Sequence, residues 1–351
     1  MKAYPLARSL CRLSLLAALP VTLLATPAGA VDAQLIEAAK KEGEVVWYTS
    51  LIVNQMVRPM EDAFNKKYPG IKLKYLRSNT EEIILKVINE SKAKRVQVDI
   101  VDGTNVTTGL LKENLVPAWV PDEAKDYPPY LKDAAGHWVA TNLYIMAPAY
   151  NTQLVKAGTQ PKTIDDLLDP KWGGGKMVWS GNVSGASGTG FVGNVLAARG
   201  ETAGMEFLRK LAKQNIVAHT TSSRQVLDQL MAGEYSVAIQ MFNHQVAISA
   251  EVGAPIDWIP MSPASVNLAV ASLVKNSPHP NAGKLLFSYM ISEEGQQLYG
   301  KSGYLPAKPS IPASVPKLKP EFGGFEAIYF NPDEFEGKIA GWNAIYQDLF
   351  R

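Results

Sequence analysis

The 351-residue chain has little cysteine, little histidine and no excess of either charge. Its single cysteine, Cys11, lies in the first thirty residues, so the rest of the chain must be held together by burial of apolar side chains. His137, His219, His244 and His279 are scattered and lack the close spacing of zinc ligands. We therefore expect no disulfide framework, no metal site and no cofactor.

The chain also lacks an apolar run long enough to span a bilayer comfortably. The run at residues 13–24 is too short, basic residues precede or flank it, and Ala28-Gly29-Ala30 follows it. This is the pattern of a secretory signal peptide, which we assign to residues 1–30. We expect its removal and a mature protein in a bacterial periplasm, without a lipid anchor because Cys11 leaves with the leader.

A basic surface is absent as well. The precursor has 35 basic and 33 acidic residues, but the leader carries three of the basic ones and no acidic one, which leaves 32 against 33. We therefore expect neither nucleic acid nor direct membrane insertion among the interactions of the mature chain.

Strands and helices are predicted to alternate along the first third of the chain. Residues 44–49, 71–76 and 98–101 read as strands, with helical patterns between them. This order is typical of an α/β fold with a mostly parallel sheet covered on both faces by helices. Apolar residues 139–150 and the segment 255–260 are interpreted as two crossings between lobes.

Small polar residues follow two of these strands. Ligands in such sheets bind beyond the carboxyl ends of the strands, where Thr49, Ser50, Gly103, Thr104 and Asn105 share one rim. Taken alone, each residue is better explained as a turn or capping residue. Their common place at the strand ends makes them candidate ligand contacts.

Residues 176–196 carry the strongest binding pattern: a short strand, a loop of Ser, Gly, Asn and Thr, and a helix start. The free N–H groups of a first helical turn favour a small anion, and Ser184 and Ser187 add hydroxyls. Residues 188–193 match G-x-G-x-x-G, but too far beyond the strand for a dinucleotide turn, and the serines miss the G-x-S-x-G nucleophile pattern. A loop without any ligand stays an open alternative.

Further candidates follow later strands. Ser222, Ser223 and Arg224 begin a second helix suited to an anion, although Arg224 is equally well explained as a solvated surface charge. Asn243 and His244 follow a predicted strand. His244 is interpreted either as a charge switch or as a hydrogen-bonded structural histidine.

Several motifs resemble the solute-binding proteins of ATP-driven (ABC) importers, in the branch of the ferric-ion-binding proteins. They are residues 276–282, 292–296 and 305–306, with support from 45–48, 150–151, 169–172 and 233–234. The resemblance implies a type II periplasmic binding fold with two α/β lobes and two crossover strands. It also implies a monomer that docks on an inner-membrane permease. We assign residues 31–140 and 262–306 to the first lobe, and 141–261 and 307–351 to the second.

The chain departs from the ferric-ion binders at one place. They have adjacent tyrosines after the strand that follows the Gly-Glu turn, where this chain has Asn243 and His244. Amides and imidazole are poorer ligands than phenolates for a hard cation, so bare ferric ion is disfavoured and an iron chelate stays open.

The resulting hypothesis is a receptor that captures a small polar, anionic solute between two closing lobes and delivers it to an importer. A periplasmic enzyme and a ligand sensor of the same fold are the rival classes, and no catalytic residue is assigned. The candidate ligand-binding residues are Thr49, Ser50, Gly103, Thr104, Asn105, Tyr144, Ser184, Ser187, Ser222, Ser223, Arg224, Asn243 and His244.

Overall fold

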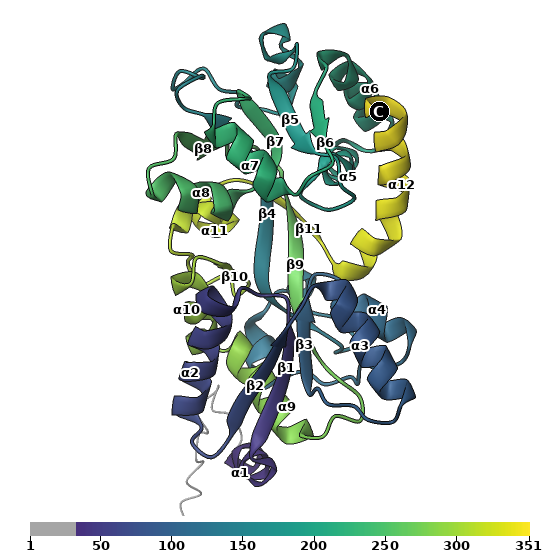
Figure 1. The fold of residues 1–351 in the computed structure, drawn as a ribbon, viewed down its shortest axis with the longest axis vertical. Helices are drawn as coiled ribbons and strands as arrows, with labels where there is room; N and C mark the ends of the chain where they lie inside the picture. The colour runs from purple at the N-terminus through teal and green to yellow at the C-terminus, as the bar shows by residue number, and fades with distance from the viewer. Residues whose placement is uncertain (1–32) are drawn as a thin grey trace, which may run out of the picture. The chain divides into compact units, whose positions relative to one another are not determined.

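The computed structural model describes residues 33–351, so the predicted signal peptide lies outside the described residues. The strands of this part form one 11-stranded sheet. Along the main path their order is β2-β1-β3-β9-β4-β7-β5-β6, and β10, β8 and β11 pair at its sides. Figure 1 shows two groups of elements joined by the long strands β4 and β9. The predicted type II, two-lobed α/β architecture is confirmed.

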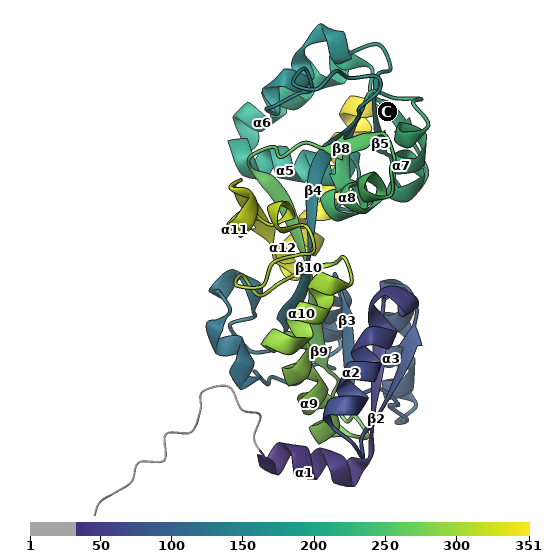
Figure 2. The same cartoon turned by 90° about the vertical axis from the view of Figure 1, so that its left-hand side faces the viewer.

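The first lobe is built on three parallel strands. They are β1 (Glu44–Thr49), β2 (Lys72–Arg77) and β3 (Ile100–Gly103). Its helices are α1 (Ala33–Glu42), α2 (Arg58–Lys67), α3 (Thr80–Lys92), α4 (Val106–Lys112), α9 (Pro280–Ile291) and α10 (Glu293–Lys301). Neighbouring residues of β1 point to opposite faces of the sheet: Trp47 is buried in the same core cluster as Phe287 of α9, and Tyr48 in another with Ile83 of α3. Helices therefore cover both faces, as Figure 2 also shows.

The second lobe repeats this plan. Its parallel strands are β5 (Met177–Ser180), β6 (Val217–His219) and β7 (Val237–Phe242). Around them lie α5 (Gly188–Arg199), α6 (Glu201–Leu211), α7 (Ser223–Met231), α8 (Asn243–Glu251) and α12 (Pro332–Phe350). Trp179, Phe191, Trp342 and Tyr346 are buried together at its centre.

Two antiparallel strands connect the lobes, β4 (Val139–Asn151) and β9 (Ala264–Leu273). The first part of β9 pairs in parallel with β11 (Ala327–Phe330), and its last part pairs with β3. Along β4, β10 (Leu305–Pro306) pairs near the start, and β7 and β8 (Ile256–Trp258) pair toward the end. Both strands thus run from one lobe into the other. The short helix α11 (Pro320–Gly323) lies in the segment between β10 and β11.

Most predicted elements are found within a few residues of their expected bounds, but the predicted return crossing was wrong. The return crossing is β9, because residues 256–258 form β8, which stays in the second lobe beside β4. Helices α8 and α10, which begin at Asn243 and Glu293, were not predicted from the sequence. No helix within residues 33–351 combines the length and hydropathy needed to cross a membrane.

Candidate functional site

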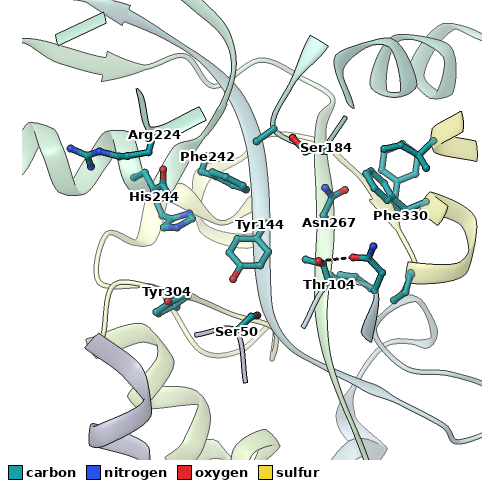
Figure 3. Close-up of a pocket in the computed structure, with 18 of the residues that line it drawn as sticks. Ser50, Thr104, Tyr144, Ser184, Arg224, Phe242, His244, Asn267, Tyr304 and Phe330 are labelled. Carbon is teal, nitrogen blue, oxygen red and sulfur yellow. Dashed lines mark hydrogen bonds between the residues drawn. The ribbon is translucent and has the colours of Figure 1, made fainter. Parts of the chain in front are cut away.

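A cavity of about 830 Å³ lies between the lobes, against β4 and β9. Figure 3 shows side chains from both lobes that line it. Seven predicted contacts line this cavity: Ser50, Thr104, Asn105, Tyr144, Ser184, Arg224 and His244. The other lining residues include Ile52, Gln55, Glu81, Gly185, Phe242, Gln245, Ile248, Asn267, Tyr304, Phe330, Pro332, Phe335, Glu336 and Ile339.

One wall of the cavity is aromatic. The Tyr144 ring centroid lies 5.4 Å from that of Phe242 and 5.9 Å from that of His244. Tyr304 stacks on His244 from the side of the first lobe, at 6.2 Å and 27°. Offset and tilted ring contacts of this kind stabilise the wall itself.

His244 is placed by the first turn of α8 and is only 6% exposed. Burial lowers the pKa of its imidazole to about 4, and Nδ1 has no hydrogen-bond partner. The ring is therefore neutral near pH 7 and offers a hydrogen-bonding nitrogen rather than a charge. The charge-switch interpretation of His244 does not fit this environment near neutral pH.

The first lobe contributes the loop after β1 and the start of α4. Leu51 N–H donates to Thr49 Oγ1 at 3.1 Å, a local turn that leaves Ser50 at the cavity. Ile52 N–H donates to the Tyr304 hydroxyl at 3.2 Å, which fixes that ring against the loop. Thr104 Oγ1 donates to Asn105 Oδ1 at 2.7 Å (Figure 3).

The second lobe contributes the loop between β5 and α5. Gly185 packs closely on Asn267 there: a Cβ at this position would lie 1.8 Å from Asn267 Nδ2, so the Asn267 side chain would have to move. The Gly185 carbonyl accepts a hydrogen bond from Gln240 Nε2 at 3.1 Å. The loop is therefore held by the sheet below it, and Ser184 and Asn267 face the cavity (Figure 3).

Arg224 lies at the edge of the cavity. Its side chain is 55% exposed, and Nη2 is 2.9 Å from Asp228 Oδ1, one helical turn away. In Figure 3 the guanidinium points away from Tyr144. Arg224 must leave Asp228 to reach a ligand beside Tyr144, so both interpretations of this residue stay open.

Six predicted contacts do not line the cavity: Thr49, Gly103, Ser187, Ser222, Ser223 and Asn243. Ser187 is a buried N-cap whose Oγ accepts from Gly190 N–H, and Ser222 forms a capping box with Gln225. Asn243 is buried, and its Nδ2 donates to the Leu318 carbonyl at 2.8 Å. Ser187 and Ser222 thus stabilise the starts of helices, and Asn243 ties α8 to the segment that contains Leu318. The sequence pattern does not distinguish such structural roles from contacts with a ligand.

Sequence reasoning missed the contacts that come from distant parts of the chain. Tyr304 precedes β10, and Phe330, Phe335 and Ile339 come from β11 and α12. Residues 332, 335, 336 and 339 have the spacing of one helical face. A helical plot of α12 could therefore have grouped these residues on one side of the helix.

A buried carboxyl group lies at the end of β3. Asp102 is fully buried, and Oδ1 accepts a hydrogen bond from Trp47 Nε1 at 2.9 Å, whereas Oδ2 has no partner. Burial raises the pKa of Asp102 to about 7. Asp102 is outside the cavity lining and supports the sheet below it.

Within residues 33–351, no group of three or more His, Cys, Asp or Glu side chains is placed to hold a metal ion. Burial also raises the pKa values of the cavity tyrosines, Tyr144 and Tyr304. Both phenols are therefore protonated near neutral pH when no metal ion is bound.

Comparison with known proteins supplies the family. The model of the bacterial extracellular solute-binding protein family matches residues 98–327, which is more than half of the chain. The chain belongs to this family. This match confirms the resemblance to the solute-binding proteins of importers, which the sequence motifs predict.

This solute-binding protein also resembles an uncharacterised protein of Haemophilus influenzae. The two are 25% identical over 276 residues, which are 76% of this chain and 78% of the relative.

Solved structures share its fold at lower sequence identity. The iron-bound HitA of Pseudomonas aeruginosa is 20% identical, with 87% of this chain and 99% of HitA covered at a TM-score of 0.69. AfuA of Actinobacillus pleuropneumoniae, bound to fructose-6-phosphate, is 22% identical, with coverages of 88% and 98% and a TM-score of 0.66. One fold thus accommodates an iron site and a sugar phosphate site.

Proposed function

We propose that this solute-binding protein captures a small polar, anionic solute in the periplasm and delivers it to the permease of an ABC importer. The leader, residues 1–30, is removed, and the mature chain acts as a monomer without catalytic activity. The lobes consist of residues 31–140 with 262–306, and of 141–261 with 307–351. The cavity on β4 and β9 is the binding site.

The observation that carries the proposal is the composition of the cavity. Hydroxyl and amide groups from both lobes face the same space, next to the first turns of α5 and α8. The first turn of α8 has no side-chain cap, so its N–H groups are available to an acceptor. A carboxylate or a phosphate ester is stabilised there by these donors and by the helix dipole.

Closure follows from the position of the lining residues on two lobes. A solute that contacts Ser50 and Ser184 at once stabilises the arrangement in which the lobes approach each other. A ligand with equal affinity for open and closed forms would shift nothing, so contacts with both lobes are the source of the movement.

An iron chelate is the alternative solute. HitA and AfuA show that the fold serves both chemistries. Bare ferric ion is disfavoured here because Asn243 and His244 stand where the ferric-ion binders have adjacent tyrosines. In a chelate, carboxylates of the chelator would take the place of the missing protein ligands.

The test is mass spectrometry of small molecules released from the mature protein, followed by calorimetry with each candidate. We expect an anionic organic compound with a dissociation constant near micromolar, which corresponds to about 8 kcal/mol. Co-purified iron with a chelator supports the alternative. Conversion of the bound compound supports an enzyme, and unimpaired solute uptake after gene deletion supports a sensor.

A further inference from the structure

The C-terminal helix α12 forms one end of the cavity. Pro332, Phe335, Glu336 and Ile339 of this helix line it, together with Phe330 of β11. These five residues follow residue 327, where the match to the family model ends. This end of the cavity is therefore a feature of the chain outside the matched family core.

A single face of α12 carries these contacts. Its C-terminal half is packed: Trp342 and Tyr346 are buried against α5, where a Cβ at Gly193 or Gly188 would lie 2.5 Å or 2.3 Å from their rings. The same face continues toward the N-terminus as Ile339 and Phe335. There it meets the cavity, so these two side chains stay partly exposed.

Two contacts across the lobes hold the first turns of α12 against α4. Thr108 Oγ1 donates to Asp333 Oδ1 at 2.8 Å, and Lys112 forms an ion pair with Glu336. Lys112 thereby compensates the negative charge of the Glu336 carboxylate, which lines this end of the cavity. The remaining surface offered by α12 is apolar.

We propose that α12 determines solute specificity by binding an apolar portion of the solute, a short alkyl chain or a ring, at Phe335 and Ile339. The solute class is then an amphipathic anion, with its anionic group at the polar residues between Ser184 and the first turn of α8. This inference rests on the proposed function. Burial of a methylene group at this end raises affinity about fourfold.

The contact between Phe335 and the loop between β5 and α5 supports this division of the cavity into a polar and an apolar part. Cζ of Phe335 would lie 3.5 Å from a Cβ at Gly185, so the ring reaches the loop that carries Ser184. The polar and apolar parts of the cavity are thus adjacent, and one small molecule spans both.

The experiment measures binding of ethyl, butyl and phenyl phosphate to the mature protein by calorimetry. We expect butyl phosphate to bind about fifteenfold more tightly than ethyl phosphate, from two methylene groups. Phe335→Ala and Ile339→Ala should each reduce this ratio below fivefold, with ethyl phosphate affinity little changed. Ile345→Ala, which alters a partly buried side chain outside the cavity on the same helix, is the control and should keep the wild-type ratio.

Phe242→Ala provides a second comparison, because Phe242 belongs to the aromatic wall. Loss of chain-length dependence in Phe242→Ala but not in Phe335→Ala places the apolar portion at that wall and overturns the proposal. Equal affinity of wild type for all three esters also overturns it and leaves anion capture intact. If none of the three esters binds, the proposal of an anionic solute is contradicted, and this inference is contradicted with it.

Discussion

His244 and Tyr304 stack on each other in the aromatic wall of the cavity, with their ring centroids 6.2 Å apart. The first belongs to α8 of the second lobe and the second to the segment before β10, which is fixed to the first-lobe loop by the hydrogen bond from Ile52. This pair joins the two sides of the site through rings rather than through ions. Because His244 is buried, its protonation is linked to the stability of the fold.

His244 should lower stability in mild acid. Its pKa falls from 6.5 to about 4 on folding, so between these values the unfolded chain binds a proton that the folded chain does not. Its contribution therefore destabilises the fold as pH falls below 6.5, by about 2 kcal/mol between pH 7 and pH 5.

Urea unfolding of wild type and His244→Gln at pH 7 and pH 5 measures this effect. We expect the variant to lose about 2 kcal/mol less than wild type over this interval. An identical loss in both proteins would show that His244 is accessible to protons in the folded state.

Ser187 should act on stability more than on binding. Its hydroxyl caps α5 and also donates to the Ser184 carbonyl at 2.6 Å, so Ser187→Ala should cost about 1 kcal/mol of unfolding free energy. Urea unfolding and calorimetry with phenyl phosphate measure the two quantities. Ser222→Ala is the matched control for loss of a helix cap outside the cavity, because Ser222 caps α7 at an exposed position. A large loss of affinity with unchanged stability would restore Ser187 as a ligand contact.

Arg224 gives a direct test of charge in the site. If it turns from Asp228 to an anionic solute, Arg224→Ala should weaken phenyl phosphate binding about tenfold, a change of about 1.4 kcal/mol. Asp228→Ala should strengthen binding, because the guanidinium no longer has to leave a partner. Wild-type affinity in both variants would make Arg224 a solvated surface charge. Calorimetry at low and high salt distinguishes these outcomes.

Lys319 should be essential for the segment between α10 and α11. Its side chain is fully buried, and Nζ donates to the carbonyls of Lys308 at 2.9 Å and Ile311 at 2.7 Å. Lys319→Met removes these donors and leaves buried acceptors unpaired, so we expect a loss of about 3 kcal/mol in urea unfolding. The exposed Lys317→Met is the control, and equal stability of the two variants would contradict the prediction.

The sequence predicted the elements that local patterns define. The apolar run of β1, predicted at residues 44–49, is an example. Helix α8 was missed because its first turn is polar and its buried residues do not follow one clear stripe. Its start is set by the end of β7 and by the bond from Asn243 to Leu318, which is a tertiary contact.

Apart from Tyr144 in the middle of β4, the predicted residues that line the cavity stand at strand or helix ends. Ser50, Thr104 and Ser184 follow strands, and the rule for parallel sheets locates them at the cavity. Tyr304 and Phe335 come from segments whose position depends on packing far along the chain. Conversely, Ser187 and Ser222 are residues of a type that often contacts ligands, but their hydroxyls cap the N-termini of α5 and α7.

The paired strands β4 and β9 have a consequence for how the molecule moves. Because Leu143, Tyr144 and Ile145 pair with Leu268, Asn267 and Val266, the connection consists of backbone hydrogen bonds rather than of unpaired loops. We expect the halves to reorient by bending and twisting of these strands while the bonds persist, with the irregular step between Ala140 and Asn142 as one place that can bend. Amide hydrogens in the middle of β4 should then exchange slowly with solvent in both the empty and the loaded receptor.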